Sequence, residues 1–137
     1  MKKVFSPEEA NRTLPLVKRI VSDIVQQHKA FSATRAEYAK LQSQKSLEAS
    51  QKSRKVELES SIKTAVAEMQ GYVAELEALG IAIKSFDEGL IDFPSSRDGR
   101  AVFLCWKHGE ESVDFWHEPD KGYAGRQPIE KAAFSTQ

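Results

Sequence analysis

The hydrophobic period of this chain changes at Gly80. Before it, apolar residues recur every three or four positions, the spacing of one face of an α-helix. After it come four short runs rich in β-branched and aromatic residues, separated by turns with Gly and Asp: IAIKSF, LIDF, AVFLCW and VDFWHE. Helices first and strands second predict an α+β fold, with a long antiparallel helical hairpin followed by a small antiparallel β-meander of about four strands.

The start of the first helix is marked by Ser6, Pro7 and Glu9, which have the spacing of a capping box with proline at the first helical position. Pro15 lacks a backbone N–H and its ring clashes with the preceding turn. The sequence therefore predicts a short opening helix and a second start capped by Thr13. A continuous, kinked helix is the alternative.

The apolar positions of both helices predict a hairpin over residues 6–79, with a polar tip at about 42–55 and Gly80 as the C-cap. The stripe of the first helix thins beyond Phe31 and comprises Val17, Ile20, Val21, Ile24, Val25, Phe31, Tyr38 and Leu41. The second helix carries a short seam of coiled-coil type: Ile62, Val66, Met69, Val73 and Leu76. We expect one domain over residues 1–137, with residues 81–129 forming the sheet and an ordered C-terminal loop.

The length of the hairpin predicts an arm that projects from the sheet. A helix from Leu14 to about Gln44 would be about 45 Å long, whereas a compact domain of this size is about 35–40 Å across. Two helices cover each other only partly, and a second copy would complete a four-helix bundle. We therefore expect a homodimer through the helices. The basic tip could also dock a protein partner, although such tips are more often simply solvated: Lys40, Lys45, Lys52, Arg54 and Lys55 against Glu48.

Composition excludes several function classes. Twenty basic and twenty acidic residues cancel, so we expect neither nucleic acid nor an anionic membrane as a partner. The start, MKKVFSPEEA, lacks the apolar core of a signal peptide, and no run of residues is apolar enough to span a bilayer. A single cysteine, Cys105, cannot form an internal disulfide, which favours a cytoplasmic location.

The register of the last hairpin decides which side chains share a face of the sheet. A turn at Gly109–Glu110 places Leu104 opposite Phe115 and Val102 opposite His117. One face then carries Val102, Leu104, Trp106, Val113 and Phe115 and ends in His117, while the other carries Phe103, Cys105, Asp114, Trp116 and Glu118. A shift of one residue would exchange the two sets. Trp106 is expected in the core.

A metal site is one hypothesis for the polar residues at the strand ends. His117, Glu118 and Asp92, with Glu9 as a further carboxylate, are ligand types suited to zinc, iron or manganese. His117 and Glu118 are adjacent, so both could bind one ion only if the strand has ended between them. The alternative is a histidine hydrogen-bonded to Asp92 or Glu118. We expect no cofactor, and a divalent metal is the one exception that these residues allow.

An anion site is a second hypothesis. Arg97, Arg100 and Arg126 could fork onto a phosphate or carboxylate, with Tyr123 in the same loop and Gly122 and Gly125 exposing backbone N–H groups. The alternative is that these arginines pair with nearby carboxylates at turns: Asp92, Asp98, Glu118 or Asp120. We expect residues 116–126 to fold back over the sheet end, anchored by Trp116 and Tyr123, with Arg126 near the 92–100 segment.

Catalysis is the third hypothesis, and the residues favour it least. Cys105 lies between Leu104 and Trp106 inside a strand and is expected to be buried and inert. His117 with Asp92 or Glu118 could act as a general base, but no nucleophile is evident. We therefore expect a non-enzymatic interaction or dimerisation protein with a polar pocket. A binder of a small anion or metal, or a hydrolase-like enzyme, at His117, Asp92 and Arg126 is the alternative.

Four segments also carry a resemblance to a known family: FSPEEANRTLP, GLIDFPSSRDGR, LCW with GEE close behind, and WHEPDKGYAGRQPI. Together they resemble the uncharacterised prokaryotic family catalogued as domain of unknown function 2203, over nearly the whole chain. The resemblance implies a small intracellular bacterial-type protein with a helical hairpin and a small sheet, and it implies no catalytic residue. The positions that match the family's motif are Glu9, Asn11, Asp92, Pro94, Arg97, Gly99, Arg100, Trp106, Gly109, Glu110, Trp116, His117, Gly122, Gly125 and Arg126.

Overall fold

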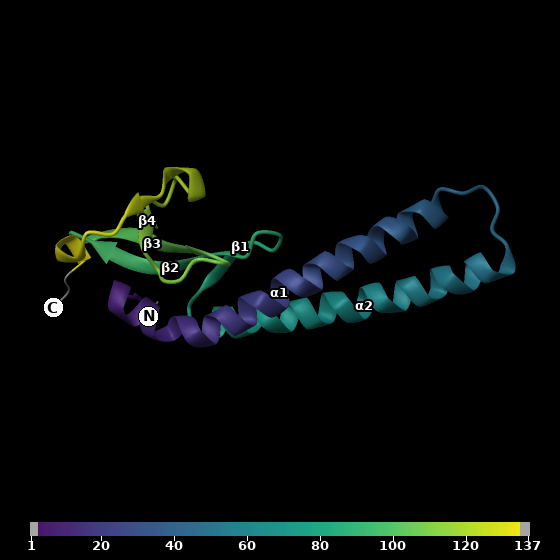
Figure 1. The fold of residues 1–137 in the computed structure, drawn as a ribbon, viewed down its shortest axis with the longest axis horizontal. Coiled ribbons are helices and arrows are strands. Elements are labelled where there is room, and N and C mark those ends of the chain that lie inside the picture. The colour runs from purple at the N-terminus through teal and green to yellow at the C-terminus, as the bar shows by residue number, and fades with distance from the viewer. Residues whose placement is uncertain (1–2, 135–137) are drawn as a thin grey trace.

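The computed structural model describes residues 3–134 and confirms the α+β fold (Figure 1). Helices α1 (Pro7–Gln42) and α2 (Ala49–Ala78) form the hairpin. A five-stranded antiparallel sheet follows in the order β1-β2-β3-β4-β5. Its strands are β1 (Ala82–Ser85), β2 (Leu90–Arg97), β3 (Arg100–Lys107), β4 (Phe115–His117) and β5 (Gln127–Pro128), and two 3-10 turns lie at η1 (Tyr123–Gly125) and η2 (Lys131–Phe134). The sequence pattern missed β5 because a two-residue strand has no period.

Helix α1 is continuous, so the predicted break near Thr13 is wrong and the continuous-helix alternative is correct. The capping box is present: the Glu9 amide donates to the Ser6 hydroxyl at 3.1 Å, and the Ser6 amide donates to the Glu9 carboxylate at 2.9 Å. The Thr13 hydroxyl donates to the Glu9 carbonyl at 2.9 Å and caps nothing. Pro15 removes one N–H from the helix, but it is exposed, and buried Leu14 and Val17 hold the helix on both sides.

The core lies between one face of the sheet and the N-terminal part of α1 (Figure 1). Its buried members include Trp106, which confirms the prediction for that residue. The others are Phe5, Ala10, Leu14, Val17, Ile20, Val21, Ile24, Leu76, Ile81, Ile91, Phe93, Val102, Leu104, Val113, Trp116 and Phe134. Within residues 3–134 no helix is both long and apolar enough to cross a membrane.

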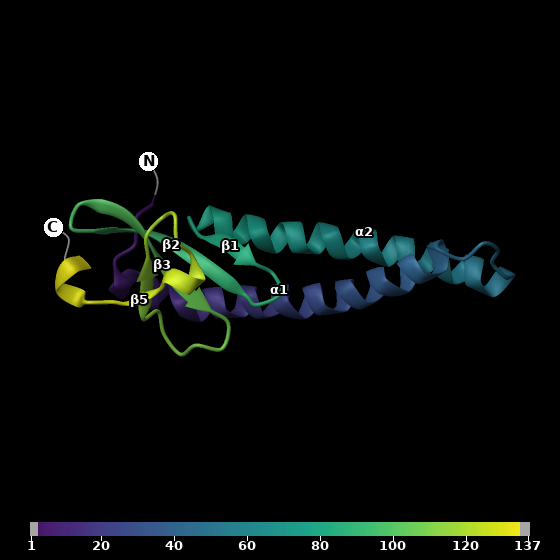
Figure 2. The same cartoon turned by 90° about the horizontal axis from the view of Figure 1, so that it is seen from above.

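The outer part of the hairpin projects beyond the sheet, as its length predicted (Figure 2). One premise of the predicted homodimer is nevertheless wrong. The stripe of α1 needs no second copy, because the sheet and α2 already bury Val17, Val21 and Ile24 within one chain. On α2, Met69 and Leu76 are buried, while Val66 remains 36% exposed. The homodimer stays a prediction that depends on α2 alone.

The tip of the hairpin uses part of its own positive charge. Arg54 forms ion pairs with Glu37 at 2.7 Å and with Glu57 at 3.3 Å. Less of the basic tip is therefore free for a protein partner than its lysine and arginine content implied. Docking at the tip stays a prediction.

The register between β3 and β4 differs from the expected one by a single residue. Leu104 pairs with Trp116, and Phe103 pairs with His117. The two-residue turn was the wrong assumption, because the connection runs from residue 108 to residue 114. Glu110 closes this connection: its carboxylate accepts from the Lys107 amide at 2.9 Å, and its carbonyl accepts from the Trp106 indole at 3.1 Å.

The shift moves two aromatic residues and one histidine between faces. Trp116 joins the core, whereas Phe115 turns to the outer face. His117 leaves the apolar face and joins the row that holds Asp92 and Cys105. The position of the candidate site therefore follows from the register.

Candidate metal centre

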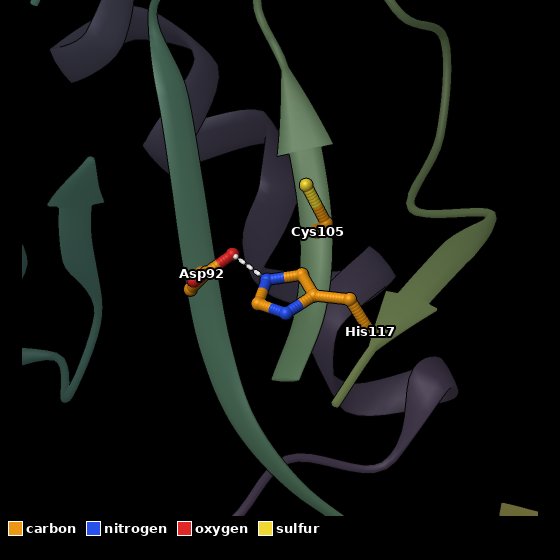
Figure 3. A group of neighbouring side chains, drawn as sticks. All are labelled: Asp92, Cys105 and His117. Atoms are coloured by element: carbon orange, nitrogen blue, oxygen red, sulfur yellow. Dashed lines mark hydrogen bonds and ion pairs between the residues drawn. The ribbon is translucent and has the colours of Figure 1, made fainter. Parts of the chain in front are cut away.

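Three buried polar side chains meet on the sheet face that points away from α1. Asp92 comes from β2, Cys105 from β3 and His117 from β4 (Figure 3). Their potential ligand atoms, one from each residue, lie within 4.8 Å of one another. All three residues are at most 3% exposed. Buried polar groups of this kind need partners, because burial without them costs free energy.

His117 is held by both of its ring nitrogens. Nε2 lies 3.0 Å from Oδ1 of Asp92, which confirms the predicted contact of His117 with a carboxylate. Nδ1 lies 2.7 Å from the backbone carbonyl of Glu118. A carbonyl oxygen only accepts, so Nδ1 carries a hydrogen and donates it there. This contact fixes the ring and directs Nε2 toward Asp92, as backbone carbonyls orient histidines that bind metals.

Cys105 is the member of the group that sequence reasoning judged inert. Burial raises the pKa of its thiol to about 11, and this outweighs the opposite effect of Arg126, whose Nη1 lies 3.9 Å from Sγ. The free thiol is therefore protonated at neutral pH, and a bound metal would have to displace that proton, as it does at thiolate sites generally. No local sequence pattern marks this position, because only the register of β4 against β3 places Cys105 on the face of His117.

Arg126 lies beside the cluster and is neutralised by Glu110. Its Nη2 donates to Oε2 of Glu110 at 2.6 Å and its Nη1 donates to Oε1 at 3.1 Å. Burial acts to raise the pKa of Glu110, but hydrogen bonds from Arg126 and Lys107 outweigh it, so the pKa of Glu110 is lowered. The guanidinium also stacks on Phe115 and Tyr123. Arg126 was expected near the 92–100 segment. Its contact on this side is with Cys105, which pairs with Asp92 in the sheet.

The three arginines of the anion hypothesis do not converge. Arg97 pairs with Glu130 at 3.2 Å, and Arg100 pairs with Glu118 at 3.2 Å. Arg100 begins β3 and Cys105 lies near its other end, so their backbones are about 16 Å apart at about 3.3 Å per residue. Each arginine has its own carboxylate, so the three cannot share one small anion. The alternative interpretation named Glu118 for this role, and also Asp98, which lies 3.7 Å from Arg97, but it did not name Glu130 or Glu110.

Three further expectations need correction. Glu118 does not join the metal-ligand group, because its side chain points to Arg100 and only its carbonyl serves His117. Glu9 is likewise occupied in the helix cap. Trp116 is buried as expected, but Tyr123 is 42% exposed and anchors the loop through its ring contacts with Arg126 and Lys107 rather than by burial.

A cavity of about 260 Å³ opens directly above Asp92 and His117. The segment after β4 forms one wall, and short hydrogen-bonded turns fold it back over the sheet: Lys121 to Glu118 at 3.0 Å, and Gly125 to Gly122 at 3.0 Å. The full lining is Lys84, Leu90, Asp92, Phe103, His117, Pro119, Asp120, Lys121, Gly122 and Tyr123. The carboxylate and the imidazole therefore face a space that holds a few atoms.

Comparison with known proteins assigns the chain to a family without assigning an activity. A family model described as "Uncharacterized conserved protein (DUF2203)" matches residues 3–129. No curated protein and no solved structure matches the chain. The matched range includes both helices, all five strands and all three residues of the buried cluster. The chain therefore belongs to the DUF2203 family of uncharacterized conserved proteins.

Proposed function

We propose that this protein binds a divalent transition-metal ion, zinc in preference to others, through Asp92, Cys105 and His117. One observation carries the proposal: an imidazole, a thiol and a carboxylate on three adjacent strands present donor atoms within 4.8 Å of one another. Three protein ligands leave one position of a tetrahedral ion free, which is the usual arrangement of zinc sites that act on or bind a further ligand.

The distances fit such an ion after small side-chain movements. Zinc bonds of about 2.0–2.3 Å in a tetrahedron place neighbouring ligand atoms about 3.3–3.6 Å apart. Nε2 of His117 and Oδ1 of Asp92 are 3.0 Å apart, so this pair must open by a few tenths of an ångström. The Cys105 side chain must move toward the other two. Rotations about side-chain bonds supply such shifts without moving the strands.

The donor types argue for the metal's identity. Calcium and magnesium prefer sites built from oxygen ligands, and a thiolate is a poor ligand for both ions. Zinc accepts sulfur, nitrogen and carboxylate oxygen in one site. The hydrogen bond from His117 Nδ1 to the Glu118 carbonyl supports the same role, because it aims Nε2 at the ion.

Purified chain without an affinity tag is expected to hold one zinc ion per molecule after dialysis against zinc and removal of the excess. Elemental analysis measures the content. Cobalt(II) should give a near-ultraviolet thiolate-to-metal charge-transfer band, and Cys105 alone can produce it because the chain has one cysteine. Cys105→Ser should lose the band, whereas His108→Ala, which removes an exposed histidine, should keep it. Zinc content as low in the wild type as in Cys105→Ser would contradict the proposal.

Self-association is a second candidate, supported by an apolar groove where α2 meets the β1–β2 turn. The groove has a volume of about 400 Å³ and is lined by Val66, Met69, Gln70, Val73, Glu77 and Phe86. We take a second copy of this chain as its occupant, because the groove runs along residues 66–77 of α2 and two copies of this segment can pack side by side as neighbouring helices of a bundle do. The apolar residues of the seam that one chain leaves partly open would then be covered.

Light scattering at high micromolar concentration is expected to give twice the 15.4 kDa chain mass. Val66→Glu should shift the mass to that of one chain, because a charge placed in the groove loses its water on association. Val56→Glu is the matched control, since Val56 is an exposed valine of α2 near the tip and outside the groove. A wild-type mass of one chain at this concentration would exclude the homodimer.

A further inference from the structure

The cavity above Asp92 and His117 is small. Its volume of about 260 Å³ lies below the range of about 300–1,000 Å³ that drug-sized ligands occupy. A ligand of only a few non-hydrogen atoms would fill it. Asp92 and His117 line the cavity, so such a ligand would touch the ion that these residues hold.

The charges around the cavity determine whether it favours an anionic or a cationic ligand. A divalent ion bound by one thiolate, one carboxylate and a neutral imidazole forms a neutral centre. Lys84 and Lys121 line the cavity against the single carboxylate of Asp120, so the wall facing the centre is net positive. An anion gains from this field, and a cation is repelled.

The backbone amide of Gly122 supplies an independent reason for an anion. It lies 3.3 Å from Nδ1 of His117. Nδ1 already donates its hydrogen to the Glu118 carbonyl at 2.7 Å, so it has no lone pair for Gly122. With that tautomer the Gly122 N–H is directed at a ring nitrogen that carries its own hydrogen, and Gly122 also lines the cavity. A small turn of the Gly122 peptide would present this hydrogen to an oxygen atom in the cavity instead.

We infer that the cavity binds a small oxyanion, a carboxylate or a phosphate, as the fourth ligand of the metal ion, with Lys84, Lys121 and the Gly122 amide holding its outer oxygens. This inference rests on the proposed metal site. The ligand's oxygens provide both a hard donor for the ion and acceptors for the lysines. Tyr123, stacked under Arg126 and Lys107, holds the loop wall in place.

Cobalt-loaded full-length protein provides the test, with sodium acetate and inorganic phosphate as the probes. Binding of either anion at the metal is expected to change the visible cobalt bands in a saturable way. Lys121→Ala and Lys84→Ala should each weaken binding about fivefold to tenfold, as loss of one charged contact does. Asp120→Asn should strengthen it, because a repulsive charge is removed. Lys29→Ala, an exposed lysine of α1, is the matched control and should change nothing.

The outcomes separate the inference from the proposal on which it rests. Cobalt bands that form but respond to neither anion would overturn the inference and leave the metal site standing. A response that the two cavity lysines do not influence would also overturn it, since the anion would then lie elsewhere. Failure to form the cobalt bands at all would remove both. A response to acetate alone or to phosphate alone supports the inference and identifies the source of the oxyanion.

Discussion

Replacing His117 with alanine is expected to lower zinc affinity by more than about 100-fold. Even the loss of an outer partner of a metal ligand costs about 10–100-fold, and His117 is itself a proposed ligand. Its Nε2 faces Asp92 at 3.0 Å, and no second histidine lies near enough to replace it, since His28 and His108 are absent from the described ligand group. Competition with a chromophoric zinc chelator measures the affinity.

The control must separate loss of a ligand from loss of the fold. His117→Ala leaves Asp92 buried without its partner, so circular dichroism must show that the variant is folded at the temperature of the titration. Asp92→Asn keeps the shape of the side chain and an oxygen acceptor, and should lower affinity by a smaller factor. His28→Ala, a half-buried histidine on α1, should bind zinc as the wild type does. A folded His117→Ala protein with the zinc affinity of the wild type would contradict the proposed site.

The architecture was predictable because the period of the apolar residues is a property of each local segment. The stripe from Val17 to Ile24 has helical spacing in any context, and the structure buries it. Ser6 and Glu9 marked the helix start correctly for the same reason, since a capping box needs only neighbours in sequence. The break assigned to Pro15 failed because packing of Leu14 and Val17 overrides a local preference.

The site was only partly predictable because it depends on pairing between strands. Asp92 and His117 were named as partners, and their contact is present. Cys105 was set aside because a cysteine between Leu104 and Trp106 looks like a core residue, and nothing local shows which face it occupies. The length of the β3–β4 connection sets the register. That connection is closed by hydrogen bonds of Glu110, which no known turn pattern in the sequence predicts.

The arginines show a site that the sequence suggested and the folded chain does not form. Arg97, Arg100 and Arg126 all lie at turns or strand ends, so their spacing allowed a shared anion. The ion pairs of the folded chain determine whether the arginines can share an anion, and each guanidinium pairs with a different carboxylate. The positive wall of the cavity is instead supplied by Lys84 and Lys121, which have no distinguishing pattern in the sequence. The net charge of a site therefore depends on which charged side chains are left without an ion-pair partner nearby.

The register that creates the site can be tested by stability alone. Trp116→Ala is expected to cost about 3–5 kcal/mol in the free energy of unfolding, the usual range for removing a large aromatic side chain from a core. Trp116 is 2% exposed, packs against Phe134 and lies under the guanidinium of Arg97. Phe115→Ala should cost less than half as much, because Phe115 is only partly buried on the outer face beneath Arg126. Urea denaturation of both variants measures the difference.

The register first expected from the sequence makes the reverse prediction. With Leu104 opposite Phe115, the phenylalanine would lie in the core and the tryptophan would lie outside, so Phe115→Ala would be the costlier change. Trp106→Ala is the reference, because Trp106 is core in both registers and should cost about 3–5 kcal/mol in either case. If Phe115→Ala destabilised the protein more than Trp116→Ala, His117 would return to the apolar face. Asp92, Cys105 and His117 could not then meet, and the metal centre would be lost together with the register.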